Sequence, residues 1–425
     1  MDLLLKGGKV YRSGSFENED VAVSDGVIVD VDRFHSGERS CITVDCSDKI
    51  IVPGLADVHV HFREPGFSYK ETIYTGTMAA ARGGYTAVCT MPNLDPAPVD
   101  KKTLDVQFDL IKKDGRVRVI PFGAITSDQS GRGVLSAMDE MAPYVIGFSD
   151  DGKGVQGGSL MEEAMLKAKS LGKVISAHCE DESLLNGGYI HDGEYAAKNG
   201  HKGICSESEW KQVERDIQLA KKTGCAYHVC HVSTGESVEL IRAAKKDGVD
   251  ITCETAPHYL ILCDEDLQED GRFKMNPPLR SRKDRQALIE GIQDGTVDMI
   301  ATDHAPHSAE EKSKGLAKSA FGVVGLETAF PMLYRYLVSE GIISPEELIE
   351  LMAVRPRKRF GITGAAIEAG KPADLAVFDT GLRQTVRPSE FCTKGRSTPF
   401  EGMQSQGRCV LTVCEGNIVW NTLSF

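Results

Sequence analysis

Strand-like and helix-like segments alternate along most of this 425-residue chain, and the alternation predicts an α/β fold. Over roughly 280 residues, eight short apolar runs are each followed by a helical pattern, which is typical of a (β/α)8 barrel. A doubly wound sheet is the alternative, but no Gly-x-Gly-x-x-Gly motif follows the first strand, which weakens its dinucleotide-binding form. We therefore expect a TIM-type barrel over residues 54–365.

The two ends of the chain differ from the middle. Short apolar runs separated by Gly, Asp, Ser and Asn occur before residue 53 and again after residue 366, and such runs predict short β-strands. Neither end contains enough strands to close a core by itself. We therefore predict one small β-sandwich domain that residues 1–53 and 366–425 build together.

The element boundaries of the barrel follow from the same pattern. The predicted strands end at Phe62, Met91, Ile125, Asp150, Asp181, Ser233, His258 and His307. The clearest helical patterns between them cover residues 71–81, 160–171, 208–222, 237–246 and 283–292. Helices at about 325–340 and 345–360 lead out of the barrel. In such a barrel the active site lies at the carboxyl ends of the strands.

Composition excludes several classes of function. The net charge of −13 argues against binding to nucleic acid or to anionic membranes. No apolar run approaches the roughly 20 residues that span a bilayer, and the first residues lack the features of a signal peptide. The 12 cysteines are scattered without a Cys-x-x-Cys pair, so we expect reduced thiols and a cytoplasmic protein.

The first barrel strand contains a candidate metal-binding pair. His59 and His61 are two residues apart, and side chains at this spacing point to the same face of a strand. Arg63 continues the alternation and adds a positive charge on the same side. The pair alone is as consistent with chance occurrence on a half-exposed strand as with metal binding. The residues at the other strand ends decide between these two interpretations.

Residues that bind metal ions or anions follow most of the other strands. They are Asn93, Asp150, Asp151, His178, His231 and Asp303. Imidazole and carboxylate groups without thiolate suit Zn²⁺ in a catalytic site. The set is too large for one tetrahedral ion, and two Zn²⁺ ions fit it better. Since strands one and eight are neighbours in a closed barrel, we expect His59, His61 and Asp303 at one ion. His178 and His231 would hold the other, with a carboxylate and a hydroxide bridging the two.

Five motifs resemble the dihydroorotases of the amidohydrolase superfamily, and the resemblance covers essentially the whole chain. The motifs are DVHVHFREPG at 57–66, MPN at 91–93, ETAPHY at 254–259, NPPLR at 276–280 and ATDHAPH at 301–307. Many superfamily members carry a carboxylated lysine between the metals. The segment FSDDG at 148–152 instead resembles the branch in which an aspartate takes that role. Spacing to His178 favours Asp151 as the bridge, with Asp150 as the alternative and Lys153 not excluded.

The resemblance implies a reaction. It is the reversible zinc-dependent cyclisation of N-carbamoyl-L-aspartate to L-dihydroorotate in pyrimidine biosynthesis. A hydroxide on the metals would attack the cyclic amide, and Asp303 would act as general acid and base. Arg63 offers a bidentate donor to the substrate carboxylate. By resemblance, Asn93 and His307 complete that clamp, Asn276 contacts the ring, and the protein forms a homodimer.

Two other functions are weighed against this one. A neighbouring cyclic amidase, such as a hydantoinase, dihydropyrimidinase or allantoinase, is disfavoured by Arg63, by Asn93 and by the missing bridging-lysine motif. A catalytically dead scaffold for a partner such as aspartate transcarbamoylase is disfavoured because the metal-binding residues are all present.

Several polar residues near these motifs are assigned no part in the site. His228 and His304 fail the strand alternation and are expected to face away from the metals. His258 is left undecided. The polar segment 308–319 is either an ordinary surface loop or a mobile rim of the site.

Overall fold

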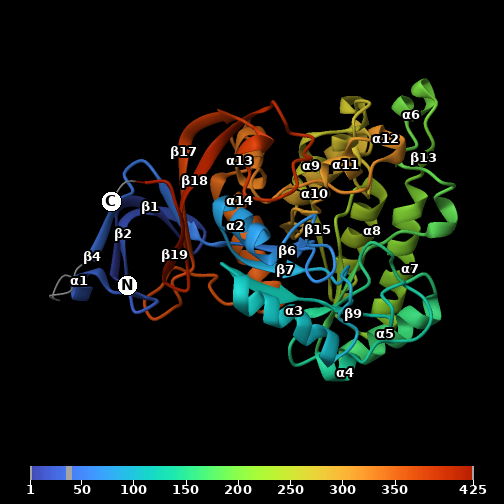
Figure 1. Cartoon of the computed structure of the whole chain (residues 1–425), viewed down its shortest axis with the longest axis horizontal. Coiled ribbons are helices and arrows are strands. Elements are labelled where there is room, and N and C mark those ends of the chain that lie inside the picture. The colour runs from blue at the N-terminus through green and yellow to red at the C-terminus, as the bar shows by residue number, and fades with distance from the viewer. Residues whose placement is uncertain (1, 35–40, 424–425) are drawn as a thin grey trace.

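The computed structural model describes residues 2–34 and 41–423, so positions 1, 35–40 and 424–425 of the predicted terminal domain lie outside the described residues. Strands from both ends of the chain gather at one end of the molecule, and the alternating strands and helices fill the other (Figure 1). Within the described ranges, no helix is long and apolar enough to cross a lipid bilayer.

The central part contains short strands that all pair in parallel. They are β6 (Leu55–Val60), β7 (Tyr85–Thr90), β8 (Arg118–Pro121), β9 (Gly123–Ala124), β10 (Gly147–Ser149), β11 (Val174–Ala177), β14 (Tyr227–Val229), β15 (Ile251–Thr255) and β16 (Met299–Ile300). The order β6-β7-β8 continues after one residue into β9-β10-β11-β14-β15-β16. His304, beyond β16, pairs in parallel with Val60, and its carbonyl accepts the His61 N–H at 2.8 Å. Pairing therefore returns to the first strand, and the predicted α/β class is confirmed.

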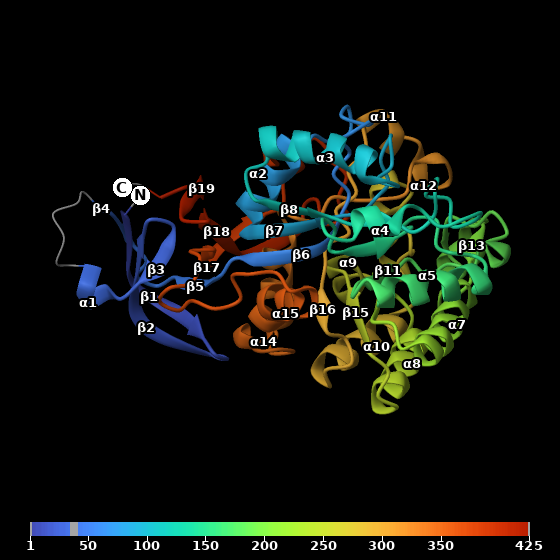
Figure 2. The ribbon, with the colours of Figure 1, turned by 90° about the horizontal axis from the view of Figure 1, so that it is seen from below.

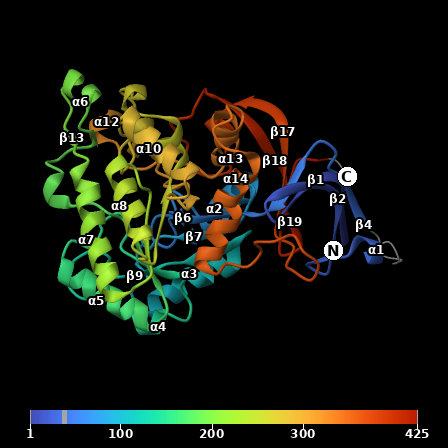
Figure 3. The ribbon, with the colours of Figure 1, turned by 180° about the vertical axis from the view of Figure 1, so that it is seen from behind.

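Helices lie outside these strands, close to their predicted positions. They are α2 (Ile73–Gly83), α3 (Lys101–Asp114), α5 (Gly158–Ser170), α7 (Glu207–Thr223), α8 (Gly235–Lys246) and α10 (Arg282–Gln293). From behind, α5, α7, α8 and α10 form an outer layer (Figure 3). Helix α2 begins at a capping box formed by Thr72 and Thr75, and it ends at Gly84 with φ 88°. These local signals explain why periodicity located the helices to within a few residues.

Several strands end earlier than predicted. The sixth strand of the repeat, β14, ends at Val229 rather than at Ser233, and the eighth, β16, ends at Ile300 rather than at His307. The cause is the backbone, because His231 has φ 34° and Asp303 has φ 48°. A strand cannot continue through these left-handed conformations, so the chain turns out of the sheet where the polar side chains begin.

The terminal segments form one eight-stranded sheet. Its strands are β1 (Asp2–Arg12), β2 (Ser15–Ser24), β3 (Val27–Val29), β4 (Cys41–Asp45), β5 (Ile50–Pro53), β17 (Leu375–Thr385), β18 (Gln404–Cys414) and β19 (Asn417–Asn421). Strand β5 joins the two ends of the chain, since it pairs with β1 on one side and with β17 on the other. All eight strands thus belong to one sheet, whereas the prediction was a sandwich, and Leu5, Ile51 and Val410 share one core cluster.

Two short helical stretches lead from the central strands to the C-terminal strands. The first is α13 (Ala329–Leu333) with the π-helical turn Tyr334–Val338, and the second runs from α14 (Pro345–Ile349) through Glu350–Val354 to α15 (Arg355–Phe360). Helices α14 and α15 lie between the terminal strands and the central strands (Figure 2). Phe330 of α13 stacks on Phe378 of β17 with ring centroids 3.7 Å apart. The terminal sheet is therefore packed directly against the central part.

Arg357 fixes the base of the first central strand. Its side chain is buried, and its guanidinium donates to the Gly54 carbonyl at 2.9 and 3.2 Å and to the Thr86 hydroxyl at 2.6 Å. Gly54 immediately precedes β6, the strand that carries His59. A helix far along the sequence thus holds the start of the strand from which the site is built.

We expect Arg357→Met to destabilise the fold by about 3 kcal/mol, because it leaves buried oxygen atoms without a donor. Urea unfolding should show a lowered midpoint. The matched control is Lys358→Met, since Lys358 is exposed on the same helix. Equal midpoints for the two variants would contradict this role for Arg357.

Candidate metal centre and substrate pocket

Six side chains from five strand ends meet in one buried cluster. His59 lies in β6 and His61 follows it, while the others come after β10, β11, β14 and β16. The six are His59, His61, Asp151, His178, His231 and Asp303, each no more than 7% exposed. The structure therefore brings together all the residues predicted to hold metal.

Asp151 occupies the centre of the cluster. Its Oδ1 lies 3.4 Å from His59 Nε2, 3.3 Å from His231 Nε2 and 3.6 Å from His178 Nδ1. Its Oδ2 lies 3.4 Å from His61 Nε2. Burial alone would raise the pKa of Asp151, but the positive charge of His59 and hydrogen bonds from His178 and His231 outweigh burial and hold it well below its ordinary range. One carboxylate thus faces both pairs of histidines.

Asp303 lies on one side of this centre. Its Oδ1 is 3.0 Å from His61 Nε2 and 3.6 Å from His59 Nε2. Burial opposes ionisation, but the hydrogen bond with His61 and the charge of His59 lower the pKa of Asp303 to about 2. Behind it, Asp57 accepts hydrogen bonds from the Thr302 N–H and hydroxyl, so the segment leading to Asp303 is held against β6.

The donor atoms fit metal ions. Two sets of three have their ligand atoms within 4.8 Å of one another, and Asp151 belongs to both: one set includes His59 and His61, the other His178 and His231. His59 Nε2 is buried without a hydrogen-bond partner, while His59 Nδ1 lies 2.7 Å from Glu254 Oε1. When Nδ1 carries the proton, the lone pair on Nε2 faces carboxylate oxygens, which is unfavourable unless a cation lies between them.

Glu254 is a functional residue that the sequence analysis did not single out. It is the penultimate residue of β15, within the ETAPHY motif, and its two oxygens lie 2.7 Å from His59 Nδ1 and 3.1 Å from His228 Nε2. A carboxylate in this position fixes the tautomer and ring orientation of a metal-binding histidine. His228 is buried and bonded on both ring nitrogens, the other to Thr252, so its hydrogen-bonding capacity is satisfied. It lies outside the cluster, but it shares Glu254 with His59 and so does not face away from the cluster as expected. Strand alternation within ETAPHY would have placed Glu254 toward the interior.

The neighbouring Asp150 has a different environment from Asp151. Its carboxylate accepts hydrogen bonds from the Ile125, Thr126 and Gly131 N–H groups, so it organises a loop. Lys153 is exposed to solvent. Of the three residues considered for the bridging position, Asp151 alone faces the histidines.

Two further histidines lie close to the cluster without joining it. His304 turns away from it, as expected: its Nε2 lies 3.3 Å from Glu71 Oε2 and its Nδ1 accepts the Gly325 N–H. His258, which was left undecided, is buried in α9 (Pro257–Ile261), and its Nε2 has no hydrogen-bond partner. Burial lowers the pKa of His258 to about 4, so this ring is neutral.

The four predicted substrate-binding residues line the same cavity as the cluster. They are Arg63, Asn93, Asn276 and His307, and the cavity has a volume of about 220 Å³. Arg63 donates to the Pro306 carbonyl at 3.2 Å, and its Nη2 lies 3.4 Å from His307 Nε2. The amide oxygens of Asn93 and Asn276 are buried without hydrogen-bond partners. Burial, together with the nearby Arg63 and Lys70, holds the pKa of His307 well below its ordinary range. The cavity thus combines a fixed cation, a neutral imidazole and free amide oxygens.

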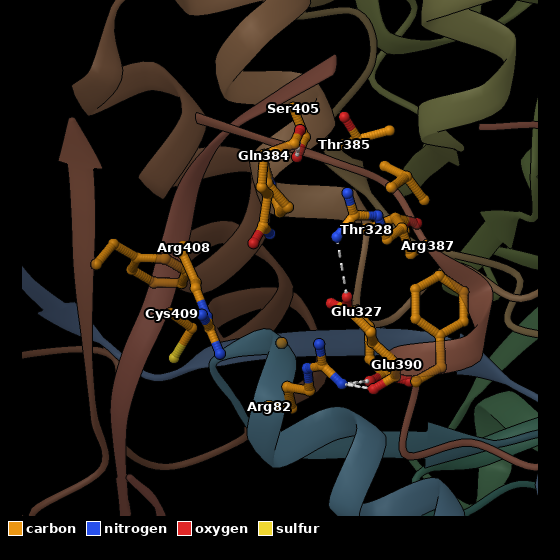
Figure 4. A pocket seen from close by; sticks show the side chains of 15 residues that line it. Arg82, Glu327, Thr328, Gln384, Thr385, Arg387, Glu390, Ser405, Arg408 and Cys409 are labelled. Carbon is orange, nitrogen blue, oxygen red and sulfur yellow. Dashed lines mark hydrogen bonds and ion pairs between the residues drawn. The ribbon is translucent and has the colours of Figure 1, made fainter. Parts of the chain in front are cut away.

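A second cavity, between α2, α13, β17 and β18, has a different character (Figure 4). Its volume is about 30 Å³, and its charged side chains pair with one another: Arg82 lies 3.2 Å from Glu327, and Arg387 lies 3.5 Å from Glu390. No histidine or aspartate lines it. The larger cavity at the strand ends is therefore the candidate active site.

Comparisons with known structures define the class of the protein. The fold resembles the L-hydantoinase (dihydropyrimidinase) of Arthrobacter aurescens, with a TM-score of 0.86, 27% identity and coverage of 100% of this chain and 97% of that one. It also resembles the dihydropyrimidinase of Brevibacillus agri NCHU1002, with a TM-score of 0.85, 20% identity and coverage of 100% and 96%. This fold, with a histidine and aspartate cluster at the strand ends, is that of the amidohydrolases.

Sequence comparisons are more specific. A family profile described as Dihydro-orotase-like matches residues 48–237. A curated dihydroorotase of Fusobacterium nucleatum is 48% identical, and the alignment covers 98% of each chain. One from Bacillus caldolyticus is 45% identical over 99% of each chain. The chain therefore belongs to the dihydroorotase family, which confirms the resemblance found in its motifs.

The contrast between the adjacent aspartates can be tested by exchanging each for asparagine. We expect Asp151→Asn to weaken Zn²⁺ binding at least about tenfold, because it removes the charge that faces four imidazoles. The Asp150→Asn variant should bind Zn²⁺ with wild-type affinity but unfold at a lower temperature. Zn²⁺ competition against a chelator of known affinity measures the first effect and thermal unfolding the second. The reverse pattern would make Asp150 the ligand.

Proposed function

We propose that the protein is a cyclic amide hydrolase that interconverts N-carbamoyl-L-aspartate and L-dihydroorotate, the dihydroorotase reaction of pyrimidine biosynthesis. Family membership supports this proposal. The structural observation that carries it is the position of Arg63, whose guanidinium lines the same cavity as the histidine and aspartate cluster. A cation in the same cavity as the reacting centre suits a substrate that carries a free carboxylate.

We propose two zinc ions in this cluster. His59, His61 and Asp303 would hold one, and His178 and His231 the other, with Asp151 shared between them. The contacts of Asp151 with histidines of both pairs support this assignment. Zinc bound there supplies a Lewis acid for the ring carbonyl and lowers the pKa of coordinated water toward neutrality.

The side chains of this chain perform the remaining steps. Asp303 is ionised and lies at the cluster, so its carboxylate accepts the proton of the attacking water and then protonates the leaving amide nitrogen. In ring closure the same carboxylate removes that proton, as microscopic reversibility requires. Arg63, with Asn93 and His307 beside it, holds the substrate carboxylate. Asn276 contacts the ring through its amide.

We also infer the architecture that presents this site. The return of strand pairing from His304 to Val60 supports a closed (β/α)8 barrel over residues 54–365. Residues 1–53 and 366–425 would form the smaller β domain. A homodimer and an association with aspartate transcarbamoylase are further predictions of the resemblance, and a cytoplasmic location is predicted from the scattered cysteines.

The function is tested by turnover of L-dihydroorotate beside hydantoin and dihydrouracil, with zinc content measured on the same sample. We expect ring opening of dihydroorotate alone. Faster turnover of hydantoin or dihydrouracil, the rings without a carboxylate, than of dihydroorotate would indicate a hydantoinase-like enzyme. An inactive, metal-free protein would favour the scaffold function.

Replacement of Arg63 should separate substrate binding from metal binding. We expect Arg63→Met to raise KM for dihydroorotate roughly ten- to hundredfold, because a charged hydrogen-bond donor to the carboxylate is lost. Zinc content should stay at the wild-type level. Arg132→Met is the matched control, since the Arg132 side chain is 60% exposed and pairs only with Glu182 among the described residues. Zinc loss in Arg63→Met would argue against a purely substrate-binding role.

The proposed chemistry also fixes the pH dependence of the equilibrium. N-carbamoyl-L-aspartate is a dianion and dihydroorotate a monoanion, so ring closure consumes one proton. Lower pH therefore favours the ring, and the equilibrium ratio should change about tenfold per pH unit between mildly acidic and alkaline buffer. Chromatographic analysis of both species after equilibration measures this ratio. A ratio independent of pH would overturn the assigned reaction.

A further inference from the structure

Lys312 is a buried lysine at the edge of the substrate pocket. It ends the short helix α11 (Ala309–Lys312), and it is only 7% exposed. Its ammonium donates to the carbonyl oxygens of Lys274 at 2.9 Å, Ala320 at 2.8 Å and Gly322 at 2.7 Å. Within the described residues, no carboxylate lies within ion-pair distance of this nitrogen. All three hydrogens of the ammonium are therefore donated to backbone carbonyl oxygens.

The carbonyls that Lys312 holds belong to two walls of the pocket. Lys274 lies just before Asn276, and Ala320 and Gly322 flank Phe321; Asn276, Phe321 and Gly322 all line the cavity beside the metal cluster. The Gly322 N–H also donates to the Lys274 carbonyl at 3.1 Å. Without the ammonium, these walls would still be joined by that backbone bond and by Lys274, whose ammonium donates to the Ala317 carbonyl at 3.0 Å and lies 4.4 Å from the centre of the Phe321 ring. The carbonyls of Ala320 and Gly322, however, would lose their donor.

The charge of Lys312 also acts on the substrate clamp. After burial, the positive charges of Arg63, Lys70 and Lys312 are what lower the pKa of His307. The group thus contributes to the positive potential at the end of the pocket where the carboxylate of the substrate would bind. Burying an ammonium is costly: burial and the charge of Lys274 lower the pKa of Lys312 to about 7. The three carbonyl oxygens around the nitrogen accept hydrogen bonds from its charged form.

We propose that Lys312 is a positioning residue for the substrate: its ammonium ties the Asn276 wall to the Phe321–Gly322 wall and so fixes the pocket before substrate binds. This inference rests on the proposed function, because it concerns the same site. Segment 308–319 is then a rim of the pocket that the buried ammonium of Lys312 holds in place. Lys312 acts on binding and does not touch the reacting atoms.

The test compares Lys312→Met, which keeps the length of the side chain without donors or charge, with Lys312→Gln, which keeps two N–H donors. The matched control is Lys318→Met, because Lys318 is exposed in the same segment. We expect KM for dihydroorotate to rise about tenfold in Lys312→Met and less in Lys312→Gln, with kcat within about twofold of wild type. Zinc content should be unchanged, and Lys318→Met should match wild type.

The outcomes distinguish the possible failures. If Lys312 had only a structural role, its replacement would lower the thermal stability and the active fraction and leave KM unchanged. That result would overturn the proposal. If Lys312→Met does not fold, KM in Lys312→Gln decides: a raised value supports the proposal and a wild-type value overturns it. A wild-type protein without dihydroorotate turnover would refute the proposed function instead.

Discussion

The central constraint on this structure is a buried carboxylate surrounded by imidazoles. Asp151 faces His59, His61, His178 and His231 within 3.3–3.6 Å, and every one of these groups is removed from water. Such a cluster is stable only if a cation shares it or if protons do. The surrounding structure determines which nitrogen lone pairs point inward. Glu254, by bonding His59 Nδ1, directs His59 Nε2 toward the centre.

The same constraint explains the interactions around the cluster. His231 and Asp303 adopt left-handed backbone conformations that non-glycine residues avoid. Buried acidic groups hold the adjoining segments, as Glu209 does by accepting from the Ser233 and Thr234 N–H groups. Glu71 does so behind His304, where it also bonds the Thr393 hydroxyl and so ties the C-terminal segment to the eighth strand end. Segments distant in sequence thus maintain the strained turns.

Sequence placed His59, His178 and His231 in one cluster because parallel strands converge at their carboxyl ends, so each histidine needed only to be assigned to the end of its strand. Spacing favoured Asp151 over Asp150 but left Asp150 as an alternative, because the two are adjacent and the path of the backbone decides which of them faces the histidines. The early strand ends were missed because no glycine marks the positive φ at His231 or Asp303. Lys312 was hidden for another reason: a lysine among serines and glutamates has the composition of a surface loop, and its burial depends on carbonyls from elsewhere in the chain.

Local charge, rather than total charge, determines what this pocket binds. The chain carries a net charge of −13, yet Arg63 is buried at the cavity wall, and Lys70 and Lys312 act on His307 beside it. Charges on the exposed surface are screened over about 8–10 Å, whereas buried charges in a water-poor cavity are screened much less. An anionic substrate therefore meets an attractive field only inside the pocket. The net charge of the chain therefore does not argue against the anionic substrate proposed for this pocket.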